Sequence, residues 1–115
     1  MPRYKMIALT SPTPGNEDEY HRWYQDVHLP EIVSFPGMVS ARRFKVAVPL
    51  QDPIKYQYLA IYEIDTDDLG QTLGQFGTRQ LTQTDASDNA NAYTVIVEEI
   101  GQEVRHEDVK DRFAG

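Results

Sequence analysis

The sequence contains no cysteine, which excludes disulfide bonds, a thiolate nucleophile and a sulfur-ligated metal site. It also lacks any apolar run near the eighteen or so residues that a membrane span needs. The apolar stretch near the N-terminus covers only Met6 to Leu9, too short for a signal peptide. We therefore expect a cytoplasmic protein that has no membrane partner.

Positive charge is scarce. Eleven Lys and Arg residues face 18 Asp and Glu residues, giving a net charge of −7 at pH 7. This balance opposes binding to a polyanion, so we expect no nucleic-acid partner. The sequence has no glycine-rich phosphate loop, and we expect no nucleotide or other cofactor. With 115 residues, the chain predicts one domain over residues 1–100 and a charged C-terminal tail over 101–115.

Hydrophobic periodicity and turn residues predict six elements, in the order strand, helix, strand, strand, helix, strand. A polar segment, Gln83–Asn91, has the composition of a flexible loop. The expected strands are 3–10, 38–48, 56–64 and 92–100, and the expected helices run over 17–28 and from about 69.

This order is typical of an α+β fold of the ferredoxin-like βαββαβ type, a four-stranded antiparallel sheet with two helices on one face. The strands carry apolar residues on both faces, whereas two helices cover only one. A second copy packed sheet against sheet would cover the other face. We therefore predict a homodimer.

The first helix carries the most informative pattern of the chain. Pro30 cannot donate to the carbonyl of Asp26, so the helix should bend or stop at Leu29. His28 precedes this break, at the edge of a helical face that carries aromatic rings. The residues of that face are Tyr20, Trp23, Tyr24 and Val27.

Two interpretations of His28 follow. An imidazole titrates near neutral pH, so His28 is a candidate for proton transfer, with Tyr24 one turn earlier as an assisting hydroxyl. Alternatively, His28 caps the helix and binds the carbonyls that Pro30 leaves free. A histidine pair at i, i+4 is missing, since His21 and His28 are seven apart, and we predict no metal site.

Other side chains are candidates for substrate binding. Trp23 is more typical of a core position, because an aromatic stripe packs a helix on a sheet. Tyr58 and Tyr62 lie on alternate positions of one strand and would line either a cavity or a dimer interface.

Neighbouring residues of the second strand complete the set of candidates. Phe44 is a further candidate for substrate contact. Arg42 and Arg43 point to opposite faces of the strand, and one of them is able to bind a substrate carboxylate. Pairing with the acidic residues that the chain has in excess is the more common role, and we expect it for both.

Several short motifs resemble the dimeric α/β-barrel superfamily, in its EthD-like group. They are Trp23-Tyr24, His28-Leu29-Pro30 with Glu31, and Pro36-Gly37 followed by the strand through Arg42-Arg43-Phe44. The resemblance implies a small-molecule pocket between the sheet and the helices, and it implies that His28 is the proton-transfer residue. Relatives in the superfamily include isomerases, polyketide cyclases, decarboxylases and cofactor-free monooxygenases.

Three hypotheses for function result. The first is a cofactor-independent enzyme that uses His28 as an acid or base on a cyclic or aromatic apolar compound, as an isomerase, cyclase, dehydratase or decarboxylase. The second is a non-catalytic ligand-binding or accessory dimeric protein. The third is a cofactor-free monooxygenase, whose substrate would have to supply its own electrons.

Overall fold

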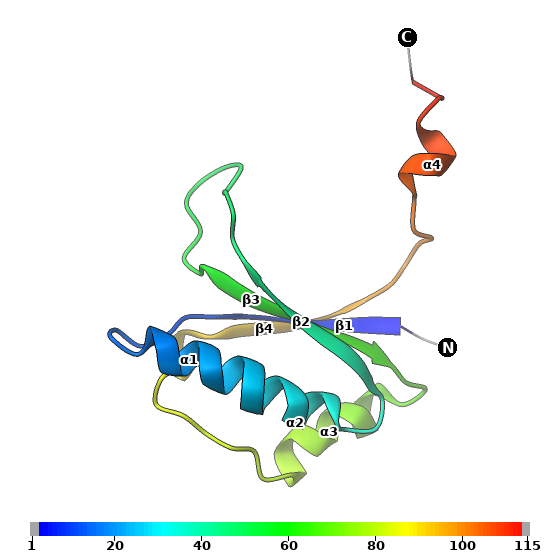
Figure 1. The fold of residues 1–115 in the computed structure, drawn as a ribbon. Helices are drawn as coiled ribbons and strands as arrows, with labels where there is room; N and C mark the ends of the chain where they lie inside the picture. The colour runs from blue at the N-terminus through cyan, green and yellow to red at the C-terminus, as the bar shows by residue number, and fades with distance from the viewer. Residues whose placement is uncertain (1–2, 114–115) are drawn as a thin grey trace.

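The computed structural model describes residues 3–113 and confirms the α+β fold, with a four-stranded antiparallel sheet whose helices cover one face (Figure 1). The strand order is β2-β3-β1-β4, and all three neighbouring pairs are antiparallel. We call the covered side of the sheet the helix face and the other side the open face. The strands are β1 (Arg3–Thr10), β2 (Met38–Lys45), β3 (Tyr58–Asp65) and β4 (Tyr93–Glu98).

The first helical segment does not end at the proline. It comprises α1 (Glu17–Trp23), the π-helical η1 (Tyr24–His28) and α2 (Leu29–Val33). The Leu29 N–H donates to the Tyr24 carbonyl, five residues back, which is the hydrogen bond of a π-helix. Pro30 then stands in the first turn of α2, where a missing N–H costs least. The predicted break is therefore a widened turn that leads directly into a further helix.

The second long helix, α3 (Leu69–Thr78), packs beside the first on the helix face (Figure 1). It begins at Asp68, whose side chain accepts a hydrogen bond from the Gln71 N–H and so caps the helix. The turn before β2 approaches α3 closely. Gly37 has a φ of +95°, and a Cβ there would lie 2.7 Å from the Thr72 hydroxyl oxygen.

The core fills the space between the helix face and the helices. Its largest fully buried side chains are Tyr20, Tyr62 and Ile64. Alternate residues of β1 and β3 supply the sheet side of the core, as period-2 strands require. The smaller members are Met6, Ala8 and Ala60.

Strand β2 contains a β-bulge between Met38 and Ser40. Regular alternation would put both residues on one face, but the bulge turns Met38 to the core, where it packs against buried residues. Beyond the bulge the alternation is regular. Arg42 lies opposite Ile61 and points to the open face, whereas Arg43 lies opposite Ala60 and points to the helix face.

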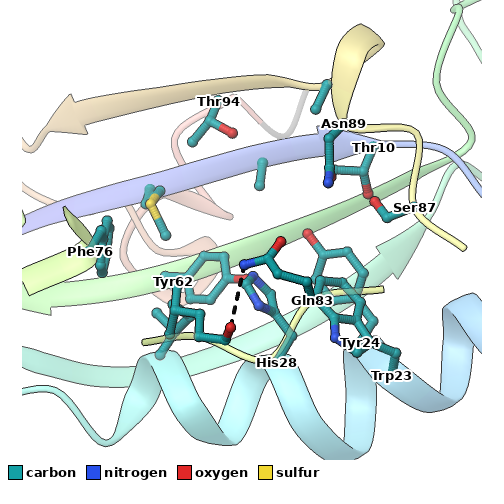
Figure 2. Close-up of a pocket in the computed structure, with 15 residues that line it drawn as sticks. Thr10, Trp23, Tyr24, His28, Tyr62, Phe76, Gln83, Ser87, Asn89 and Thr94 are labelled. Atoms are coloured by element: carbon teal, nitrogen blue, oxygen red, sulfur yellow. Dashed lines mark hydrogen bonds between the residues drawn. The ribbon is translucent and has the colours of Figure 1, made fainter. Parts of the chain in front are cut away.

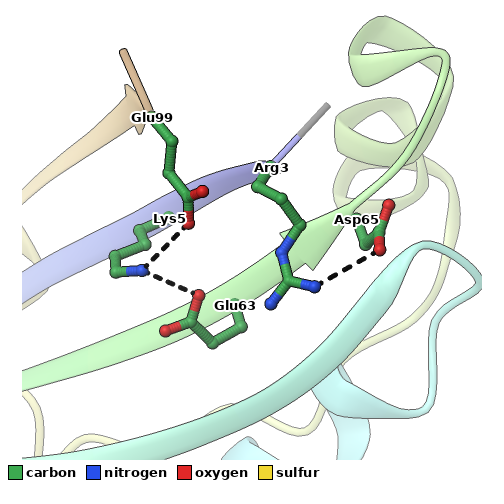
Figure 3. Close-up of polar contacts among 5 residues, drawn as sticks. All are labelled: Arg3, Lys5, Glu63, Asp65 and Glu99. Carbon is green, nitrogen blue, oxygen red and sulfur yellow. Dashed lines mark hydrogen bonds and ion pairs between the residues drawn. The ribbon is translucent and has the colours of Figure 1, made fainter. Parts of the chain in front are cut away.

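The open face is largely apolar and is covered by no other part of the described chain. Its most exposed apolar residues are Phe44 (43%), Tyr93 (58%) and Val97 (37%). An ion-pair group closes one end of this face, with Lys5 Nζ 3.0 Å from Glu63 and 3.6 Å from Glu99 (Figure 3). An apolar centre beside a charged rim is typical of a protein interface. The half-buried centre consists of Ile7, Leu9, Leu59, Ile61 and Val95.

The C-terminal segment leaves the end of β4 and projects away from the sheet (Figure 1). It contains a one-turn helix, α4 (His106–Val109). Its ion pairs are local, joining Arg105 to Glu103 and Lys110 to Glu107. None of the helices within residues 3–113 combines the length and the apolar character needed to cross a membrane.

Candidate functional site

A cavity of about 330 Å³ lies between the helix face of the sheet and the helical segment that contains His28. We call it the His28 pocket. Figure 2 shows Trp23, Tyr24 and His28 rising from the helix toward the strands. The other lining residues are Met6, Ala8 and Thr10 of β1, Ile32, Tyr62, Phe76, Leu81, Gln83, Ser87, Asn89, Ala92 and Thr94.

The π-helical turn sets the orientation of His28. Trp23 and His28 are five positions apart in the sequence. This spacing does not bring side chains together in a regular α-helix. In the wider turn the imidazole stacks on the indole, with ring centres 4.5 Å apart and an angle of 19° between the planes. The Tyr24 ring meets the imidazole edge-on at 5.3 Å. Local π-helical turns are frequent at functional sites.

Burial keeps the His28 imidazole neutral. It lowers the pKa of His28 from 6.5 to about 4, against an opposing effect of the Glu31 carboxylate. Nδ1 is buried without a hydrogen-bond partner among the described residues, and the His28 side chain lines the pocket.

Phenol groups gather beside the imidazole. Tyr24 and Tyr62 both line the pocket, and burial raises the pKa of each. The Tyr24 hydroxyl interacts with those of Thr10 and Tyr62, and Thr10 also forms a hydrogen bond with Tyr20. These phenols are neutral hydrogen-bond donors at pH 7. Neutral phenols are able to stabilise an oxygen on which negative charge develops.

The segment between α3 and β4 closes the pocket. The indole N–H of Trp23 donates to the Thr82 carbonyl over 3.0 Å, and Gln83, Ser87 and Asn89 line the pocket. The polar, small-residue composition of residues 83–91 predicts a loop, but it gives no indication of which side chains face a cavity.

The structure places Tyr58 outside the pocket, although it points to the helix face. Its ring contacts His21 edge-on, with ring centres 4.7 Å apart. Neither Tyr58 nor Tyr62 lies on the open face.

Arg42 and Phe44 do not reach the pocket either. Both lie on the open face, opposite Ile61 and Leu59, because alternate residues of a strand share one face. Neither residue lines the His28 pocket, and a substrate contact at these two positions stays a prediction. The expected acidic partners of Arg42 and Arg43 are also missing, since neither forms an ion pair with a carboxylate of residues 3–113. Sequence reasoning did not connect Arg43 with the aromatic residues of the first helix.

The arrangement is suited to proton transfer on a small molecule. Within residues 3–113 no three His, Asp or Glu side chains gather closely enough to hold a metal ion. The lining combines apolar side chains with one imidazole and several hydroxyls and amides, the usual composition of a small-molecule site.

The fold is the ferredoxin-like α+β fold that the sequence resemblance led us to expect, and three solved structures share it. An EthD family protein from Bacillus halodurans superposes with a TM-score of 0.57 at 18% identity, covering 85% of this chain and 99% of that chain. A DABB family protein with a ferredoxin-like fold, from Mesorhizobium loti, gives 0.56 at 10% identity, covering 88% and 100%.

A third solved structure with this fold is a candidate monooxygenase from Shewanella loihica, with a TM-score of 0.53 at 15% identity and coverage of 89% and 99%. No family model and no curated protein matches the sequence. At these identities the likeness concerns the fold alone.

Proposed function

We propose that this protein is a cofactor-independent enzyme in which His28 removes a proton from a small cyclic or aromatic compound. The observation that carries the proposal is the half-buried, neutral imidazole of His28 in the wall of the pocket. A group with a pKa of about 4 is uncharged at pH 7, so it begins the reaction as a base. Such a weak base requires an acidic substrate proton, for example one adjacent to a carbonyl group or on a phenol.

The pocket supplies what the following steps need. When His28 takes the proton, negative charge moves to a substrate oxygen, to which Tyr24 and Tyr62 donate hydrogen bonds. The imidazolium then returns the proton at another position of the substrate. Return at a different carbon gives isomerisation, and attack of the carbanion within the same molecule gives cyclisation. In a dehydratase, the carbanion would expel a hydroxyl group, which takes the proton of the imidazolium and leaves as water. In a decarboxylase, His28 would take the proton of a carboxylic acid, and the carbanion that is left by loss of carbon dioxide would take this proton back.

The lining indicates the shape of the substrate. Ile32, Phe76 and Leu81 form an apolar wall, and the volume of about 330 Å³ admits only a small molecule. Gln83 and Asn89 at the closing loop are available to a polar substituent. An apolar ring with one or two oxygen substituents meets both conditions.

The open face supports the proposal of a homodimer. Its apolar centre would be costly to leave in water, and an identical sheet offers a matching surface. Packing of the two open faces leaves each His28 pocket on the far side of its own sheet. We propose this dimer as the working form of the protein, in the cytoplasm, with residues 101–115 as a tail outside the domain.

Two alternatives remain. The candidate monooxygenase among the structural neighbours favours a cofactor-free oxygenase, in which the substrate carbanion itself would reduce oxygen. A non-catalytic ligand-binding protein would use the same pocket without proton transfer, and His28 would then serve as a structural group.

Hydrogen–deuterium exchange tests proton removal without knowledge of the reaction. A panel of cyclic ketones and phenols is incubated in D₂O with the protein, and loss of carbon-bound protons is followed by NMR. The wild type should accelerate exchange in at least one compound, and His28→Asn should abolish the acceleration while His106→Asn, in the tail, retains it. Equal exchange by wild type and His28→Asn would contradict the role of His28 and favour the ligand-binding alternative.

A further inference from the structure

Arg43 is a partly buried cation without a carboxylate partner. Its guanidinium donates to His21 Nδ1 over 2.8 Å, and no Asp or Glu of residues 3–113 forms an ion pair with it. This is unexpected in a chain that has 18 acidic and 11 basic residues. A buried charge is usually paired, because desolvation is costly. An anion would stabilise the partly buried Arg43, and the described chain does not supply one.

The guanidinium packs on the phenol rings at the side of the His28 pocket. Its central carbon lies 4.9 Å from the ring centre of Tyr24 and 5.5 Å from that of Tyr20. Tyr24 lines the pocket and Arg43 does not. Tyr24 therefore contacts the cation and also lines the pocket.

The positive charge of Arg43 acts in the same direction on both phenols of the pocket, Tyr24 and Tyr62. Burial raises the pKa of Tyr24 and of Tyr62, and the charge of Arg43 opposes it in both. His21 is neutral at pH 7, since burial and Arg43 lower its pKa. Lys45 adds positive charge at His21, whereas Glu17 and Asp18 add negative charge there. Glu31 adds negative charge at His28, whose ring meets that of Tyr24 edge-on.

We propose that Arg43 makes the Tyr24 side of the pocket an oxyanion site, so that the pocket favours the anion that proton removal by His28 produces, namely an ionised phenol, enol or 1,3-dicarbonyl compound. The ligand oxygen accepts hydrogen bonds from the Tyr24 and Tyr62 hydroxyls. Arg43 is a positioning residue that acts through the Tyr24 ring. The inference rests on the proposed function of the pocket and specifies the charge state of its ligand.

The test uses 4-nitrophenol, whose anion absorbs visible light and whose neutral form does not. Its dissociation constant is measured well below and well above the pKa of the free compound, and the absorbance of the bound probe reports its ionised fraction. For the wild type, we expect the anion to bind on the order of tenfold more tightly than the neutral form. In Arg43→Met this preference should disappear, and the bound probe should be less ionised at a given pH.

Matched variants separate charge from structure. Arg42→Met removes the neighbouring guanidinium on the open face and should leave the preference unchanged. Arg43→Lys keeps a cation and should restore most of the preference, which a purely structural role would not predict. His28→Asn should keep the preference for the anion even if it loses proton transfer, so failure of the proposed function is distinguished from failure of this inference.

Three results would overturn the inference. The first is equal preference for the anion in Arg43→Met and Arg42→Met, and the second is tighter binding of the neutral form by the wild type. The third is the absence of any binding of 4-nitrophenol to the wild type at millimolar concentration.

Discussion

The carboxylate of Glu31 accepts hydrogen bonds from both the backbone N–H and the hydroxyl of Thr82, 51 positions later in the chain. The distances are 3.1 Å from Oε1 to the backbone nitrogen and 2.7 Å from Oε2 to the hydroxyl oxygen. The indole N–H of Trp23 donates a hydrogen bond to the carbonyl of Thr82. One loop residue is therefore fixed by two side chains that lie on either side of His28 in the sequence. The helix that carries the candidate base also anchors the segment that closes the pocket.

Replacing Glu31 with Ala should loosen this segment. We expect faster amide hydrogen exchange at residues 82–87 and weaker binding of pocket ligands, with a stability loss of about 1 kcal/mol because the bonds are partly exposed. The pKa of His28 should fall further, since Glu31 opposes the effect of burial. Exchange measured by NMR checks the first point. Glu19→Ala removes the exposed Glu19–Arg22 ion pair of the same helix and should leave exchange in the loop unchanged.

The turn before β2 offers a test of the packing between Gly37 and α3. Gly37→Ala forces a side chain into the left-handed region and against Thr72, with contacts of 2.7 and 2.9 Å. We expect a loss of at least about 2 kcal/mol. Gly15 has a similar φ of +83°, but a Cβ there would meet no atom within 4 Å. Gly15→Ala should therefore cost about 1 kcal/mol. Urea denaturation of both variants checks this order, and equal losses would show that contact with Thr72 does not matter.

The proposed dimer is tested at the centre of the open face. Ile61→Glu introduces a charge among apolar residues and should convert the protein to a monomer, as measured by analytical ultracentrifugation. Gln25→Glu adds the same charge at an exposed position of η1 and should leave the mass unchanged. A wild type that sediments as a monomer at micromolar concentration would refute the dimer.

Much of the fold was predictable, because strand alternation and turn residues act locally. Strand β1 has the expected bounds, Arg3–Thr10, and α3 begins at Leu69, where the second helix was expected. The widened turn at Tyr24–His28 was not predictable in detail. Pro30 indicates that a hydrogen bond is lost, but whether the chain breaks or widens depends on the packing of Trp23 and Tyr24 against the sheet and loop.

The part of the site on the first helix was predictable only in part. Helical spacing brings Tyr24 and His28 together, whereas the contact of Trp23 with His28 depends on the π-helical turn. Arg43 comes from β2 and reaches the phenols through the register of β2 with β3. A bulge of one residue shifts that register, and nothing in the sequence marks it. For this reason Arg42 and Arg43 were not distinguishable before the structure.

Burial of a neutral His28 predicts a pH dependence of stability. The pKa is about 4 in the folded protein against 6.5 in the unfolded chain, so between these values the unfolded chain binds more protons. Stability should therefore be fully present above pH 6.5 and decrease as the pH falls toward 4, by up to about 3 kcal/mol. His28→Asn should lose less stability over this interval. Urea denaturation of both proteins at several pH values isolates the difference, and equal losses would contradict the half-buried, neutral state.

The most direct measurement is an NMR titration of the His28 imidazole nitrogens. His28→Asn identifies its signals among those of the three histidines. We expect a midpoint near pH 4 and a neutral ring throughout the range in which the protein would act as a base. A midpoint at or above 6.5 would place the ring in water and contradict the proposed proton transfer.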